Sequence, residues 1–116
     1  MKMISVAVGL MLVCANANAD PVVDAYDAMM AAGKVTAQRG EACEVSVQKD
    51  DLAPCRAFTK ANGVYRGKIK AFLATIDPKT DNVYNHITEQ DVQAYMEQNK
   101  RIERSMDYVI AHSEAS

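Results

Sequence analysis

The sequence predicts an all-α fold, a small three-helix domain held together by one disulfide. Three stretches carry apolar residues three, four or seven positions apart, the spacing of amphipathic helices, and turn-forming residues separate them. No internal repeat is present, which favours a single domain over a repeat array. Two cysteines, Cys43 and Cys55, form an even pair in a chain that begins with an export signal. These observations together define the predicted fold class.

Residues 1–19 have the features of a secretory signal peptide. Lys2 gives a positive start, residues 4–13 form a nearly unbroken apolar run, and residues 17–19 (Ala-Asn-Ala) are a small-x-small cleavage site. The run is shorter than the roughly 18 to 20 residues that a membrane-spanning helix needs. A lipid anchor at Cys14 is the lesser alternative, because the preceding Val13 is not small. We therefore expect a periplasmic or secreted domain, residues 20–116, with no stable membrane anchor after cleavage.

The length and charge of this domain limit its functions. Removal of 19 of the 116 residues leaves 97, enough for one small domain. Lys2 is the only charged residue removed, so 12 basic and 15 acidic residues remain, a net charge of −3. Basic and acidic residues look interspersed along the chain, which is typical of a solvated surface. This balance predicts neither nucleic acid nor an anionic membrane as a partner.

The cysteine pair predicts a structural disulfide. Cys14 lies in the signal, so Cys43 and Cys55 can form only one intramolecular bridge in an oxidising compartment. Eleven residues separate them, unlike the Cys-x-x-Cys turn of redox-active pairs. A loop of this length predicts a stabilisation of about 3 kcal/mol.

The first helix is predicted over residues 21–39. Asp20 is a suitable cap, Pro21 suits a first helical turn, and Gly40 is a natural stop. Residues 41–53, with Cys43 near their start, are then an extended connection. On this interpretation the disulfide joins the connection to the start of the second helix. The apolar positions of the first helix are Val22, Val23, Tyr26, Met29, Met30 and Ala32.

The second helix is predicted over residues 54–76, and a hairpin is the alternative. Asn62-Gly63 is a strong turn signal, so an α+β domain with a hairpin at 64–87 also fits. The helical phase nevertheless continues across Gly63, which favours one helix. Gly63 and Gly67 share a helix face and mark either a close helix contact or a tolerated weak point. The apolar stripe consists of Cys55, Phe58, Tyr65, Ile69, Phe72 and Ile76.

The third helix is predicted after a polar loop at 77–87. Residues 88–91 (Thr-Glu-Gln-Asp) resemble a capping box, with Ile87 and Val92 as a hydrophobic staple around it. The helix is expected to run to about His112. Its apolar face is predicted from Val92, Tyr95, Met96, Ile102, Met106, Val109 and Ile110.

The sequence predicts no catalytic, cofactor or metal site. Oxidised cysteines offer no nucleophile, and His86 and His112 lie in different elements without acidic residues at metal-ligand spacing. No nucleotide-binding or hydrolase motif occurs. In the loop, His86 is interpreted as a solvated side chain. We therefore expect a non-enzymatic protein.

The leading functional prediction is binding of another protein. Such a chain could be an inhibitor or immunity-type factor, or an accessory factor of an envelope, secretion or conjugation system. Tyr84 and His86 are the candidate partner contacts, because loop aromatics are favoured at interfaces. The alternatives are a periplasmic chaperone-like stress protein, or a helical carrier of a small apolar ligand. The carrier's cavity would be lined by Phe58, Tyr65, Phe72 and Met106.

Overall fold

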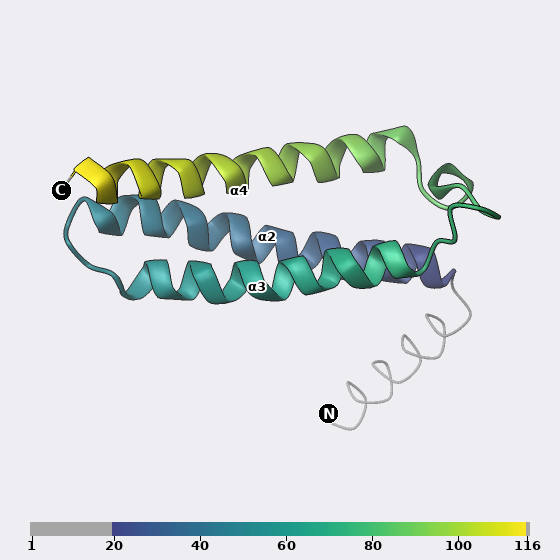
Figure 1. The fold of residues 1–116 in the computed structure, drawn as a ribbon, viewed down its shortest axis with the longest axis horizontal. Helices are drawn as coiled ribbons and strands as arrows, with labels where there is room; N and C mark the ends of the chain where they lie inside the picture. The colour runs from purple at the N-terminus through teal and green to yellow at the C-terminus, as the bar shows by residue number, and fades with distance from the viewer. Residues whose placement is uncertain (1–19, 116) are drawn as a thin grey trace, which may run out of the picture.

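The computed structural model describes residues 20–115, with side chains to Ser113, and these residues form three long helices. They are α2 (Pro21–Val47), α3 (Ala53–Ala74) and α4 (Glu89–Ala115), with a short 3-10 helix η1 (Val83–Asn85) between the last two. In Figure 1, α2 runs between α3 and α4, antiparallel to the first and parallel to the second. The all-α prediction is confirmed, and the hairpin alternative at 64–87 is wrong, because residues 20–115 contain no strand. The predicted signal peptide, residues 1–19, lies outside the described residues.

The first helix is longer than its sequence predicts. It continues through Gly40 to Val47, so Cys43 lies inside α2 and the connection shrinks to residues 48–52. Gly40 serves close packing instead of helix termination. A Cβ at this position would lie 2.9 Å from Ser105 Cβ and 3.0 Å from Phe58 Cε1. The predicted loop at 41–53 is therefore wrong, and the disulfide joins the last turns of α2 to the first turn of α3.

The helix starts follow the local sequence signals. Asp20 Oδ1 accepts a hydrogen bond of 2.8 Å from the Val22 backbone N–H, and Pro21 occupies the first turn. At the start of α4, Thr88 and Asp91 form the predicted capping box. The Thr88 N–H donates to Asp91 Oδ2 at 2.9 Å, and the Asp91 N–H donates to Thr88 Oγ1 at 3.1 Å. Both caps satisfy backbone groups that a helix cannot pair internally.

Three α2 residues spaced seven apart, Tyr26, Gly33 and Gly40, each contact an aromatic ring of α3 in the core. Tyr26 meets Phe72 edge to face at a ring separation of 6.0 Å, and the rings of Tyr65 and Phe58 lie over Gly33 and Gly40. The same antiparallel register brings the Cα atoms of the disulfide to 4.5 Å. Small residues on α2 thus let two helices pack closely on it. The buried apolar side chains are Val22, Tyr26, Met29, Ala37, Cys43, Val47, Phe58, Tyr65, Phe72, Ile87 and Ile102.

The structure decides between the two alternatives for Gly63 and Gly67, and one detail of the predicted face of α4 is wrong. Nothing lies within 4 Å of a Cβ built at Gly63 or Gly67, so these glycines do not mark a close helix contact within residues 20–115. Met96 and Ile110, assigned to the apolar face of α4, are 47% and 51% exposed. The buried face of α4 instead includes the polar Ser105, which lies against Gly40 of α2, where the narrow space admits only a small side chain.

Candidate functional site

The candidate site is a groove between α3 and α4. Each of these helices packs along α2, whereas α3 and α4 make few contacts with each other. Three hollows, each lined by residues from both helices, lie along this seam. We call them together the α3–α4 groove, and singly the end hollow, the middle hollow and the disulfide hollow.

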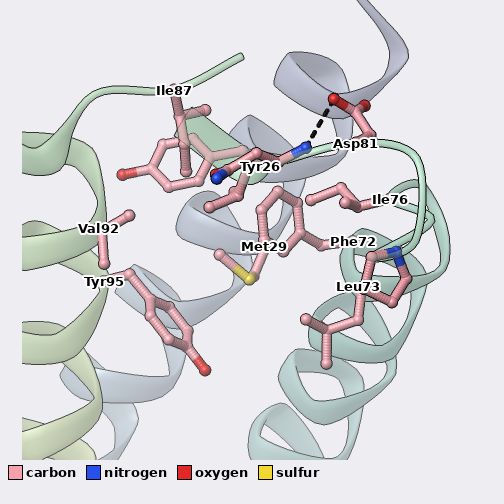
Figure 2. A pocket seen from close by; sticks show the side chains of 12 residues that line it. Tyr26, Met29, Phe72, Leu73, Ile76, Asp81, Ile87, Val92 and Tyr95 are labelled. Carbon is pink, nitrogen blue, oxygen red and sulfur yellow. Dashed lines mark hydrogen bonds between the residues drawn. The ribbon is translucent and has the colours of Figure 1, made fainter. Parts of the chain in front are cut away.

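The end hollow is the largest, with a volume of about 560 Å³. Figure 2 shows Met29 of α2 at its centre, with Phe72 and Leu73 of α3 facing Tyr95 of α4. Leu73 is 62% exposed, so the hollow opens to solvent beside an unpartnered apolar side chain. The complete lining is Tyr26, Met29, Phe72, Leu73, Ile76, Pro78, Asp81, Asn82, Val83, Ile87, Val92 and Tyr95.

The other two hollows continue the groove toward the disulfide. The middle hollow measures about 310 Å³ and the disulfide hollow about 280 Å³, and Asn62 and Met106 line both. Tyr65 crosses the seam and donates a hydrogen bond of 2.6 Å to Asn99 Oδ1. Ile110, 51% exposed, lines the disulfide hollow with Cys43, Cys55, Phe58, Thr59 and Val109. The groove therefore carries exposed apolar side chains at both of its ends.

The aromatic stripe predicted to line one cavity is divided among these hollows. Phe72 lines the end hollow, Tyr65 the middle hollow and Phe58 the disulfide hollow. Met106 lines the last two. All three rings also pack against α2, at Tyr26, Gly33 and Gly40.

A histidine clasp ties the loop above the end hollow to the start of α2. His86 Nδ1 pairs with Asp20 Oδ2, and His86 Nε2 lies 2.6 Å from Asp81 Oδ2. The His86 side chain is 20% exposed, so its interpretation as a solvated loop residue is wrong. Asp81 also accepts hydrogen bonds from the Asn82 N–H and from Asn85 Nδ2, at 2.8 and 2.9 Å. Since Asp81 lines the end hollow, the clasp fixes part of its wall.

The clasp shifts the pKa values of all three groups. The hydrogen bond to Asp20, then that to Asp81, raises the pKa of His86 above 6.5. The hydrogen bond from His86 lowers the pKa of Asp20. Hydrogen bonds from Asn85 and then His86 lower the pKa of Asp81 to about 2. Each shift favours the charged form of its group, because His86 lies beside two carboxylates and each carboxylate accepts hydrogen bonds.

The remaining sequence-predicted residues occupy different settings. Cys43 and Cys55 are joined, so neither is a nucleophile. Tyr84 is 54% exposed on η1, and the nearby His86 is engaged in the clasp with 20% of its side chain exposed, so their role as partner contacts stays a prediction. The ring of His112 stacks on Tyr108 near the end of α4, with centroids 6.2 Å apart. The groove itself was not predicted from the sequence. Leu73, an apolar residue outside the predicted stripe of the second helix, is the signal that could have indicated it.

No group of three or more metal-ligating side chains is assembled within residues 20–115. Over the same residues, no helix combines the length and apolarity needed to cross a membrane. The sequence matches no protein-family model, and neither a curated protein nor a solved structure matches it.

Proposed function

We propose that this chain is a periplasmic or secreted, non-enzymatic protein that binds another protein by accepting an amphipathic helix in the α3–α4 groove. The observation that carries this proposal is the row of three hollows along one seam. An amphipathic helix presents apolar side chains at every third or fourth position, and such a row offers a place for each. The disulfide and the export signal both support an oxidising compartment.

The shape of the groove favours a helix over a compact ligand. A small molecule would fill one hollow and leave the others open, together with Leu73 or Ile110. A helix laid along the seam would cover all three and convert the open layer into a four-helix arrangement. Burial of a leucine-sized side chain contributes about 1.5 to 3 kcal/mol, so the two exposed rim residues alone offer substantial binding energy.

The second candidate function is a carrier of a small apolar ligand, and the end hollow favours it. Its volume of about 560 Å³ falls within the range of about 300 to 1,000 Å³ that small-molecule sites occupy. Tyr26, Met29 and Tyr95 give it an apolar and aromatic lining. A periplasmic chaperone-like protein would use the same groove, but for many different client segments.

Capture from periplasmic extract, followed by native mass spectrometry, separates these functions. A single co-purifying protein supports the helix acceptor, a bound small molecule the carrier, and a mixture of clients the chaperone. The double variant Leu73→Asn/Ile110→Asn should weaken capture of a protein partner at least about tenfold, because two apolar contacts are lost.

Val64→Asn is the matched control for this experiment. Val64 is also on α3 and 53% exposed, but it lines a separate hollow formed by α2 and α3 only. Unchanged capture by the groove double variant, or equal loss in the control, would remove the groove from the proposal.

A further inference from the structure

Of the three long helices, α3 alone carries charged residues of a single sign. α3 contains five basic residues and no acidic residue between Ala53 and Ala74. All five side chains are exposed, and within residues 20–115 none of them forms an ion pair. The expectation that the two signs are interspersed is therefore wrong for α3. We call these residues the basic face: Arg56, Lys60, Arg66, Lys68 and Lys70.

The basic face is diffuse and has no exposed aromatic side chain, although the apolar Val64 is 53% exposed within it. Its first and last cations are fourteen residues apart, which spans about 21 Å of helix. Arg66 lines the middle hollow with Glu103, and Lys60 lines the separate hollow between α2 and α3 with Arg39. The other three cations line none of the hollows described above. Gly63 and Gly67 lie exposed among them, with open space where a side chain would stand. The positive charge thus extends along α3, and the five cations do not converge on one pocket.

We propose that the basic face of α3 adsorbs the protein to an anionic lipid surface. Clusters of four to eight basic residues on a helix attract acidic lipid headgroups, at about 1 kcal/mol per Lys or Arg near the surface. The arrangement fits a sheet of spread negative charge better than a protein partner, because protein interfaces concentrate binding energy in aromatic and buried anchors. Stacking aromatics, which single-stranded nucleic-acid sites use, are also absent from the exposed positions 56–70.

The net charge of the chain does not indicate this basic surface. A net charge of −3 outside the signal predicts no anionic partner, yet α3 alone carries five positive charges. Electrostatic attraction acts over a Debye length of about 10 Å at 0.1 M salt, so the nearest face dominates and the distant acidic residues contribute less. The proposal uses the basic face of α3, which shares only Arg66 with the groove. Arg66 is therefore left unchanged in the variants below.

Co-sedimentation with vesicles tests the proposal. The probes are vesicles of phosphatidylglycerol and phosphatidylcholine in equal parts, and vesicles of phosphatidylcholine alone, at low and high salt. The purified protein should bind the anionic vesicles only, and high salt should release it. Lys60→Gln/Lys68→Gln/Lys70→Gln should weaken binding about one-hundred-fold, or about fivefold for each cation removed.

The matched control is Lys34→Gln/Lys49→Gln/Lys100→Gln. It makes the same change in net charge at exposed lysines outside α3, and glutamine has nearly the same helix propensity as lysine. This control should bind anionic vesicles as the unaltered protein does. Circular dichroism of both triple variants checks that the helices are retained.

Four results would overturn the proposal. They are no binding to anionic vesicles at low salt, equal binding to neutral vesicles, equal weakening in the two triple variants, and tighter binding to duplex DNA than to anionic vesicles at the same salt. The last result would assign the basic face to nucleic acid. Failure of these tests leaves the capture experiment on the groove unaffected, because Leu73 and Ile110 are unchanged in both triple variants.

Discussion

Gly33 of α2 lies directly against the ring of Tyr65 of α3. A Cβ at Gly33 would stand 2.7 Å from Tyr65 Cε1 and 2.0 Å from Gln98 Oε1 of α4. Tyr65 is only 2% exposed, so its ring has little room to move. The absence of a side chain at Gly33 therefore lets both α3 and α4 approach α2 closely at this point.

Gly33→Ala should destabilise the protein by about 1 to 3 kcal/mol, because the added methyl group overpacks a buried contact. Gly63→Ala is the matched control. Its position is helical and open, so alanine should stabilise the protein by about 0.5 to 1 kcal/mol. Urea unfolding of the two variants measures both changes. If Gly33→Ala proved neutral or stabilising, the close contact at Tyr65 would be wrong.

Removal of the disulfide should lower stability while leaving the helices intact. The bridge closes a loop with a sequence separation of 12, for which the chain-entropy estimate is about 3 kcal/mol. Cys43→Ser/Cys55→Ser should lose about this much free energy of unfolding in urea. Thiol labelling of denatured, unreduced protein that comprises residues 20–116 checks the premise independently, since two reactive cysteines would contradict the bridge.

The clasp predicts a defined pH dependence of stability. The pKa of His86 is raised above 6.5, so its contribution is fully present below about pH 6.5 and is lost as the pH rises through the folded-state value. Asp20 and Asp81 have pKa values lowered from 3.8, so their contributions are present above about pH 4 and are lost as the pH falls, for Asp81 through about 2. The clasp is therefore strongest between about pH 4 and 6.5.

Thermal unfolding from pH 5 to pH 9 measures this dependence. The melting temperature of the unaltered protein should fall as His86 loses its proton. In His86→Gln that fall should be smaller, and the variant should be less stable than the parent at pH 5. Parallel curves for the two proteins would show that the clasp does not contribute to stability.

The helix starts and the continuous second helix could be predicted from the sequence, because their signals are local. The Asp20 cap, the capping box at Thr88 and the unbroken phase across Gly63 all concern residues within a few turns of one another. Gly40 does not end α2 as its sequence context predicts, because a glycine required for packing against a neighbouring helix cannot be distinguished in sequence from one that ends a helix.

Long-range features could not be predicted from the sequence. His86 meets Asp20 across 66 positions, a pairing that no short motif encodes. The groove depends on how far α3 and α4 are held apart by α2, which is a property of packing and not of any single segment.

The hydrogen bond across the groove gives a further prediction. Tyr65 donates to Asn99 Oδ1, so Tyr65→Phe keeps the ring over Gly33 and removes only the bridge between α3 and α4. We expect a loss of about 1 kcal/mol in urea unfolding, because Asn99 loses its donor in a partly buried setting. Tyr84→Phe, on an exposed ring with no side-chain hydrogen bond among the described residues, should change stability by less than about 0.5 kcal/mol.

The same pair of variants predicts a difference at high pH. Burial, and then the nearby Tyr95, raises the pKa of the Tyr65 phenol above 10. The stability that this group contributes is fully present below about pH 10 and is lost as the pH rises toward the folded-state value, because only the unfolded chain then releases the proton readily. Urea unfolding at pH 9 and pH 11 should therefore show a smaller fall in Tyr65→Phe than in Tyr84→Phe. Equal falls would mean that the Tyr65 hydroxyl is open to solvent and that the two outer helices are not joined across the groove.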